Sequence, residues 1–132
     1  MTKKRILLGD DEPSVLKVTK LRLEHEGYEV IVAADGAQVV ERAAQALPIH
    51  LILLDVRMPK MDGYQVCRTL KGNTGTAGIP IIIFTASEAQ AQVLADRCIE
   101  IGAFDWIKKP FRANELLAKI HRALGEEEAS HG

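Results

Sequence analysis

The sequence has little cysteine, almost no net charge and no long hydrophobic run, and each absence removes a class of protein. Its 132 residues include two cysteines, Cys67 and Cys98, which lie in helical patterns without metal-binding or redox spacing. We therefore expect two reduced, buried thiols in a cytoplasmic protein. A formal net charge of -1 creates no general attraction to nucleic acid or to an anionic membrane. No apolar run approaches the roughly 20 residues of a membrane-spanning helix, and the first residues lack the apolar stretch of a signal peptide.

The residues that are present predict alternating strands and helices. Hydrophobic residues make up 47% of the chain and charged residues 27%, as in an ordinary folded domain. Aliphatic runs at residues 6–8, 51–54 and 81–84 fit parallel strands covered on both faces, and mixed segments at 28–32 and 104–107 fit edge strands. A first helix is expected to begin at Pro13 and to end at Gly27. The apolar stripes of four further helices are Val40, Ala43, Ala44 and Leu47; Gly63, Val66, Cys67 and Leu70; Leu94, Cys98 and Ile101; and Leu117, Ile120 and Leu124.

Five strand–helix units in succession predict a parallel sheet with right-handed crossovers. The expected fold class is α/β, a flavodoxin-like (βα)5 three-layer sandwich with five parallel strands in the order 2-1-3-4-5, an order known for flavodoxin. Residues 1–125 are assigned to this domain. Residues 126–132 are expected to be a polar tail, disordered or part of a truncated linker. Whether the chain stands alone or belongs to a longer protein is left open.

Reactive side chains follow four of the five predicted strands, and in such sheets ligands bind outside the carboxyl ends of the strands. These residues are Asp10, Asp11 and Glu12, then Asp55, then Thr85, then Lys108 and Lys109. The second strand ends in two alanines, with nothing reactive. Carboxylates about 4 Å apart repel by roughly 4 kcal/mol per pair at an effective dielectric of about 20, and a magnesium ion with oxygen ligands would relieve this repulsion. A carboxylate nucleophile, a metal, a lysine and a hydroxyl together predict phosphoryl transfer to aspartate.

Each residue also has a plainer explanation. An acidic run after a strand can simply cap the next helix, Thr85 can be a core or capping residue, and Lys109 can be a solvated loop residue. Trp106 is most simply an apolar residue of an edge strand. Asp55 is different, because a lone carboxylate at the end of a buried strand is costly unless it is paired. No single residue decides the function, so the prediction of phosphoryl transfer depends on all of these residues lying together at the carboxyl ends of the strands.

Four sequence blocks resemble the signature of response regulator receiver domains, the phospho-accepting modules of two-component signalling. They are ILLGDDE at residues 6–12, LDVRMPKMDG at 54–63, FTA at 84–86 and WIKKPF at 106–111. The resemblance covers residues 4 to about 124, and the second block is specific by itself. Gly9 departs from the pattern, because an aliphatic residue is common there, and looser packing is expected at that point.

The resemblance implies a magnesium-dependent acceptor site. Asp55 corresponds to the phosphorylated aspartate, and Asp11 to the direct metal ligand. Asp10 assists through water or by orienting the site. The backbone carbonyl of Arg57 is implied as a further metal ligand, and Lys109 pairs with the phosphoryl group.

The resemblance also implies a switch. Thr85 corresponds to the hydroxyl that moves toward the phosphoryl group, and Trp106 to the aromatic switch position, usually tyrosine or phenylalanine. Because tryptophan is larger, full inward burial is less assured. The bond between Lys109 and Pro110 is typically cis in this family.

The resulting hypothesis is a receiver domain that accepts a phosphoryl group from a sensor histidine kinase or a histidine phosphotransfer protein. It would switch the face formed by the fourth predicted helix (Leu94, Cys98 and Ile101), the fifth strand (104–107) and the fifth helix (Leu117, Ile120 and Leu124). That face would contact an output domain, a target protein or a second copy in a homodimer. The chain would catalyse only its own phosphorylation and dephosphorylation, and is not otherwise an enzyme. Direct nucleic-acid and membrane binding are not expected.

Two alternatives compete with this hypothesis. The first is a non-phosphorylated, receiver-like interaction module, although such modules usually lose an acid, the threonine or the lysine, and this chain keeps all of them. The second is a phosphohydrolase or a flavin-binding protein on a similar sheet. The hydrolase would want a second acid at Arg57, and the acids at 10–12 would repel a flavin phosphate.

Overall fold

The computed structural model describes residues 3–46, 48–86, 89, 93, 96–97 and 100–126, which build a five-stranded parallel sheet with helices on both faces. The strands are β1 (Arg5–Gly9), β2 (Glu29–Ala33), β3 (Leu51–Asp55), β4 (Ile81–Thr85) and β5 (Asp105–Lys108). The helices with defined bounds are α1 (Pro13–His25), α2 (Gly36–Gln45), α3 (Gly63–Lys71) and α5 (Ala113–Leu124). The strand order is β2-β1-β3-β4-β5, so the predicted fold class and the two edge strands are confirmed.

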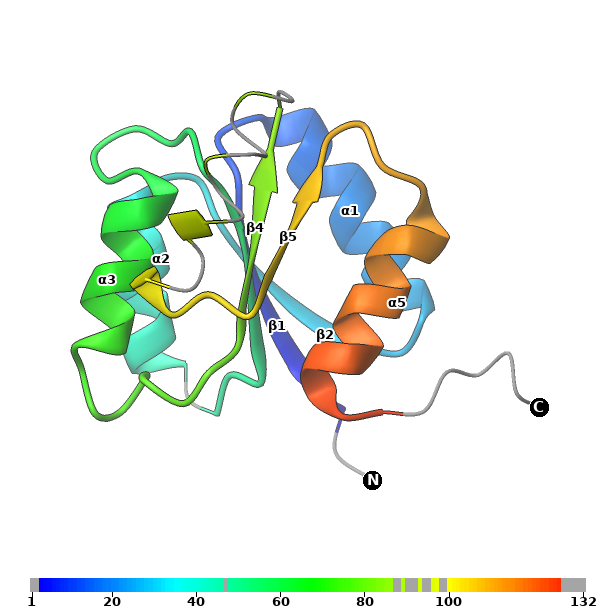
Figure 1. Ribbon diagram of the computed structural model, residues 1–132. Helices are drawn as coiled ribbons and strands as arrows, with labels where there is room; N and C mark the ends of the chain where they lie inside the picture. The colour runs from blue at the N-terminus through cyan, green and yellow to red at the C-terminus, as the bar shows by residue number, and fades with distance from the viewer. Residues whose placement is uncertain are drawn as a thin grey trace.

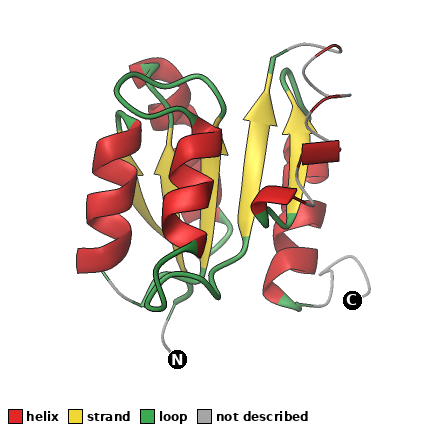
Figure 2. Cartoon of the chain, turned by 60° about the vertical axis from the view of Figure 1, so that its left-hand side comes forward, coloured by secondary structure: helices red, strands yellow, loops and turns green. Residues whose placement is uncertain are grey.

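Helices α1 and α5 cover one face of the sheet, and α2 and α3 cover the other (Figure 1). Figure 2 shows the same three layers from another side. Neighbouring residues of β3 alternate between two hydrophobic cores: Ile52 and Leu54 join the core under α2 and α3, while Leu51 and Leu53 join the core under α1 and α5. A strand buried on both faces needs apolar residues at every position, which explains the continuous aliphatic runs.

The ends of the helices follow local sequence signals. Asp62 and Gln65 form a reciprocal capping box at the start of α3, and Asp35 caps α2 by accepting a hydrogen bond from the amide of Gln38. Helix α1 begins at Pro13, and the chain after it turns at Gly27, whose φ of 97° lies in the left-handed region. Both predicted ends of α1 are therefore confirmed.

Two predicted helix stripes are shifted in the structure. In α2 the buried residues include Val39 and Ala43, whereas Ala44 is exposed. The reason is that Val39 and Ala43 lie on the side of α2 that packs into the core under α2 and α3, and Val40 contacts this core only from its edge. In α5 Leu116 is buried together with Ile120, and Leu117 is only partly buried.

The remaining stripes have different outcomes. The α3 stripe of Gly63, Val66, Cys67 and Leu70 is buried as predicted. Leu47, Leu94 and Cys98 lie outside the described residues, while Ile101 is helical and packs against the core under α2 and α3.

Gly9 does not loosen the sheet, contrary to the expectation from sequence. An ideal Cβ atom at this position would lie 2.6 Å from Cγ2 of Val39 and 3.5 Å from the sulfur of Met58. Real Cβ atoms do not approach other atoms as closely as 2.6 Å, so the glycine allows α2 and the segment after β3 to pack directly on the end of β1.

Candidate functional site

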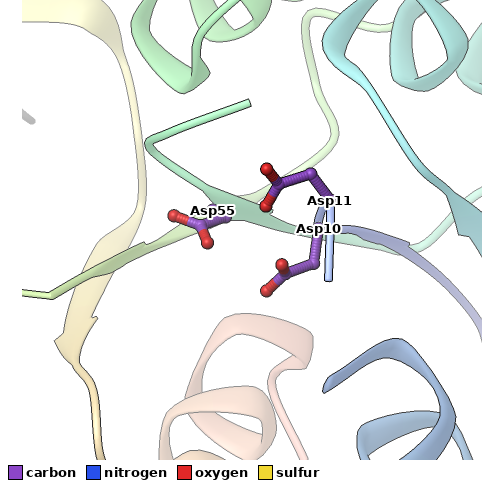
Figure 3. Close-up of side chains that lie close together, drawn as sticks. All are labelled: Asp10, Asp11 and Asp55. Carbon is purple, nitrogen blue, oxygen red and sulfur yellow. The ribbon is translucent and has the colours of Figure 1, made fainter. Parts of the chain in front are cut away.

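Three carboxylates gather at the carboxyl ends of β1 and β3. Gly9 of β1 pairs with Leu54 of β3, so the residues that follow, Asp10 and Asp55, are neighbours across the two strands. One oxygen each of Asp10, Asp11 and Asp55 lies within 4.8 Å of the others. Figure 3 shows the three side chains at the adjoining strand ends. Asp10 is fully buried and Asp55 is 9% exposed, whereas Asp11 is exposed.

The two buried carboxylates use their oxygens in the same way. Oδ1 of Asp10 accepts a hydrogen bond of 3.0 Å from the amide of Glu12, and Oδ1 of Asp55 accepts one of 3.0 Å from the amide of Arg57. Each is the local bond from an aspartate to the backbone two residues later that is common in turns. The Oδ2 atoms of both residues point to a shared partner, the ammonium group of Lys109.

Lys109 joins the two carboxylates from the end of β5. Its Nζ lies 2.7 Å from Oδ2 of Asp10 and 2.8 Å from Oδ2 of Asp55. Burial by itself would lower the pKa of Lys109, but hydrogen bonds to and charges of the two aspartates outweigh this effect and raise the pKa above its ordinary value. The amide of Lys109 donates to the carbonyl of Thr85, and the Lys109–Pro110 bond is cis, as the resemblance implied.

Thr85 and Trp106 lie on the two strands beside this cluster. Thr85 ends β4, is fully buried and pairs in register with Lys108. Trp106 pairs with Ile83 and is only partly buried against the core under α2 and α3. Incomplete burial agrees with the larger size of tryptophan.

The acidic cluster does not serve as a cap for α1. Glu12 is the N-cap residue, and within the described residues it makes no side-chain capping bond, nor does the first turn of the helix carry an acid. The plain explanation of the acidic run as a helix cap is therefore wrong, and Asp10 instead pairs with Lys109.

The donor set fits a magnesium ion. Three carboxylates and one ammonium group leave two negative charges in excess, and all the candidate ligands are oxygens, as magnesium prefers. Asp11 and Arg57 also line an open pocket of about 460 Å³ beside the cluster. This pocket gives the exposed side of the cluster room for an ion, its waters and a further anion.

Comparison with known proteins agrees with this geometry. The family model for the response regulator receiver domain matches residues 6–121. The chain belongs to the response regulator receiver domain family. It is therefore a signalling domain of two-component systems.

Three similar proteins illustrate the family. A probable transcriptional regulator, ycf27 of Cyanophora paradoxa, is 41% identical over 97% of this chain and 51% of its own length. The DNA-binding response regulator MtrA of Mycolicibacterium smegmatis is 35% identical over 96% of this chain and 53% of its own length. The chain spans about half the length of these curated relatives. The receiver domain of sensor histidine kinase PA1611 from Pseudomonas aeruginosa PAO1 has a TM-score of 0.83 and 34% identity, covering 95% of this chain and all of that one, and its structure holds a magnesium ion in the active site cleft.

The structure thus brings Asp10, Asp11, Asp55 and Lys109 together and sets Thr85 and Trp106 on the adjacent strands. Sequence reasoning missed the segment after β2, where Asp35 and Gly36 contact the loop between β3 and α3. The signal available was an Asp-Gly pair at a helix start. Among the described residues, no helix combines the length and apolarity needed to cross a membrane.

Proposed function

We propose that Asp55 accepts a phosphoryl group from a phosphohistidine of a sensor histidine kinase or a histidine phosphotransfer protein. The observation that carries this proposal is the bridge from Lys109 to Asp55 and Asp10, with distances of 2.8 and 2.7 Å. The ammonium group of Lys109 is thereby held beside the Asp55 carboxylate, and Asp11 and Arg57 line an open pocket beside the cluster. A cation fixed next to the nucleophile favours the transfer of an anionic group to aspartate.

The transfer is a substitution at phosphorus. An oxygen of the Asp55 carboxylate forms the new bond to phosphorus, the bond from phosphorus to the imidazole nitrogen breaks, and the imidazole leaves with that electron pair. Lys109 stands where its ammonium group can stabilise charge on the phosphoryl oxygens. The amide of Arg57 holds Oδ1 of Asp55 and so orients the carboxylate before the reaction.

Magnesium would be held by Asp10, Asp11, Asp55 and the backbone carbonyl of Arg57. When bound, it would neutralise part of the charge on the phosphoryl group. The excess of two negative charges in the cluster and the magnesium ion in the PA1611 receiver domain support this assignment.

Phosphorylation would change the charge at Asp55, and residues at the ends of β4 and β5 would respond to that change. Thr85 and Lys109 lie at the ends of these strands, where their side chains can bind the new acceptor oxygens in one arrangement of the following segments. β5 is tied to α5 by the pair Lys119–Asp105, at 3.1 Å. We propose that β5, α5 and the predicted helix of Leu94, Cys98 and Ile101, which lies largely outside the described residues, form the face that contacts a target, an output domain or a second copy.

The alternative is a receiver-like interaction module that is not phosphorylated. Complete retention of Asp10, Asp11, Asp55, Thr85 and Lys109 favours the phosphorylated form. A DNA-binding role belongs to the full-length relative named above, and with its net charge of -1 this chain is not proposed to bind DNA directly.

The test uses Trp106, the single tryptophan. Its fluorescence is followed while magnesium and then beryllofluoride, an analogue of the phosphoryl group, are added to the wild type and to Asp55→Asn. A saturable magnesium response followed by a beryllofluoride response that Asp55→Asn lacks is expected. No response to either addition would favour the interaction module.

A further inference from the structure

The N-terminus of α2 is in direct contact with the loop between β3 and α3, residues 56–62. The amide of Gly36 donates a hydrogen bond of 3.3 Å to the carbonyl of Pro59. Nζ of Lys60 lies 3.4 Å from Oδ2 of Asp35. An ideal Cβ atom at Gly36 would lie 2.0 Å from the carbonyl oxygen of Met61, a distance that no side chain tolerates. The loop therefore rests on the backbone of α2 at a position where only glycine fits.

The contacted part of the loop is a strained turn. Lys60 has a φ of 68°, and the amide of Met61 donates a hydrogen bond of 2.7 Å to the carbonyl of Pro59, two residues back. This is the three-residue turn with positive φ, which is rare for a residue with a side chain. Such a conformation persists only where surrounding contacts hold it, and here the contacts come from Asp35 and Gly36.

The same loop carries backbone groups of the acceptor site. The amide of Arg57 holds Oδ1 of Asp55, and the Arg57 carbonyl is a proposed metal ligand only two residues before Pro59. Between them, Met58 packs over Gly9 at the end of β1. The far end of the loop is fixed by a hydrogen bond of 2.9 Å from the amide of Gly63 to the carbonyl of Val56. The loop is thus held at its start, at its turn and at its end.

We propose that Asp35 and Gly36 are positioning residues that set the backbone of Arg57 for metal binding by bracing the strained turn at Lys60. This inference rests on the proposed function, since it concerns the affinity of the same site for magnesium. Neither Asp35 nor Gly36 is itself a ligand; each acts through the loop.

Gly36→Ala tests whether the contact of Gly36 with the loop positions the turn, with Gly78→Ala as the matched control. A Cβ atom at Gly78 would meet nothing within 4 Å, so the control makes the same chemical change in open space. Magnesium affinity is measured by calorimetry on the full chain, together with hydrogen exchange of the loop amides in the metal-free protein. Gly36→Ala is expected to weaken magnesium binding about tenfold and to speed exchange at Met61, while Gly78→Ala matches the wild type.

A second pair of variants tests the turn without a steric clash. Lys60→Gly removes the backbone strain of the positive φ and also allows the turn to adopt other conformations. Lys60→Asn removes the same positive charge, but asparagine restricts the backbone more than glycine does and tolerates the positive φ. Loss of a nearby cation alone would strengthen magnesium binding equally in both variants. The proposal instead predicts weaker binding in Lys60→Gly than in Lys60→Asn, without a lower melting temperature.

The outcomes distinguish the positioning role from the proposed function. If the wild type binds magnesium and Gly36→Ala and Lys60→Gly bind it as well as their controls, the positioning role is wrong and the proposed function stands. If the wild type binds no magnesium, the metal-dependent function fails, and the positioning role fails with it. Weaker binding that tracks faster exchange at Met61 in both variants supports the positioning role.

Discussion

Nζ of Lys109 lies 2.8 Å from Oδ2 of Asp55, and the same ammonium group lies 2.7 Å from Oδ2 of the fully buried Asp10. One lysine from the end of β5 thus pairs with carboxylates from the ends of β1 and β3. Because a buried carboxylate is costly without a partner, Lys109 has a structural role in addition to the chemical role proposed for it.

Replacement of Lys109 by methionine is expected to destabilise the metal-free protein. Asp10 would then lose its cation in a buried position, at a cost of roughly 2 kcal/mol, less than for a fully enclosed pair because Lys109 is partly exposed. Magnesium should recover much of the loss by supplying another cation. Urea denaturation in chelator and in magnesium measures both values, and equal losses in the two conditions would contradict this role.

Replacement of Asp55 by asparagine is expected to have the opposite effect and to stabilise the metal-free protein. The three carboxylates exceed the single ammonium group of Lys109 by two negative charges. Asparagine removes one of these charges and keeps an oxygen for the amide of Arg57. In chelator the stability should rise by about 1 kcal/mol, or roughly 4 °C in melting temperature for a chain of this size. The gain should shrink in magnesium. A melting temperature in chelator equal to or below that of the wild type would argue against net repulsion.

Cys67 is expected to be unreactive in the folded protein. Burial raises the pKa of its thiol to about 11, although the charge of Lys71 acts in the other direction. The folded state therefore keeps the proton at pH values where an unfolded cysteine loses it, and this contribution to stability falls as the pH rises through that range. At a pH of about 8, close to the ordinary pKa of a thiol, iodoacetamide should label Cys67 only after urea is added, as peptide mass spectrometry would show. Rapid labelling of the native protein would contradict this burial.

Glu126 should stabilise the fold near neutral pH and lose that effect in acid. Its Oε1 accepts a hydrogen bond of 2.8 Å from the hydroxyl of Tyr28, and Nζ of Lys4 lies 3.4 Å from its Oε2. Burial alone would raise the pKa of Glu126, but the bonds from Tyr28, His121 and Lys4 outweigh it and lower the pKa. A lowered pKa contributes stability above the unfolded value, and this is lost as the pH falls through the folded value.

Glu126→Gln should therefore cost about 1 kcal/mol near neutral pH. The difference from the wild type should shrink below roughly pH 4, where the carboxyl group protonates. Urea denaturation at the two pH values checks this, with Tyr28→Phe as a variant that removes one partner only. A cost that does not change with pH would mean that Glu126 acts through packing.

The sequence predicted most of the fold and the charged part of the site, for physical reasons. Doubly buried strands require continuous aliphatic runs, and parallel strands bring residues at their carboxyl ends together, so the amino-acid order alone was enough to group Asp10, Asp55 and Lys109. The burial of Val39 rather than Ala44 could not be predicted from periodicity alone. It depends on which side of α2 packs into the core between the sheet and α3.

The contact of Gly36 with the loop after β3 could not be predicted from the sequence either. Which loop packs on which helix end depends on the three-dimensional path of residues 56–62, and an Asp-Gly pair only indicates a turn or a helix start. Gly9 is similar: a missing side chain suggests loose packing, but here Val39 and Met58 fill the space. Close backbone approach is visible only in the folded molecule.

The central claim is that Asp55 accepts a phosphoryl group, and it is tested most directly by mass spectrometry of the intact protein. The wild type is incubated with a small phosphoryl donor such as acetyl phosphate, in magnesium or in chelator, beside Asp55→Asn. We predict a mass increase of one phosphoryl group in magnesium, little or none in chelator, and none in Asp55→Asn. The same increase in Asp55→Asn, or no increase in a wild-type protein that binds magnesium, would contradict the claim.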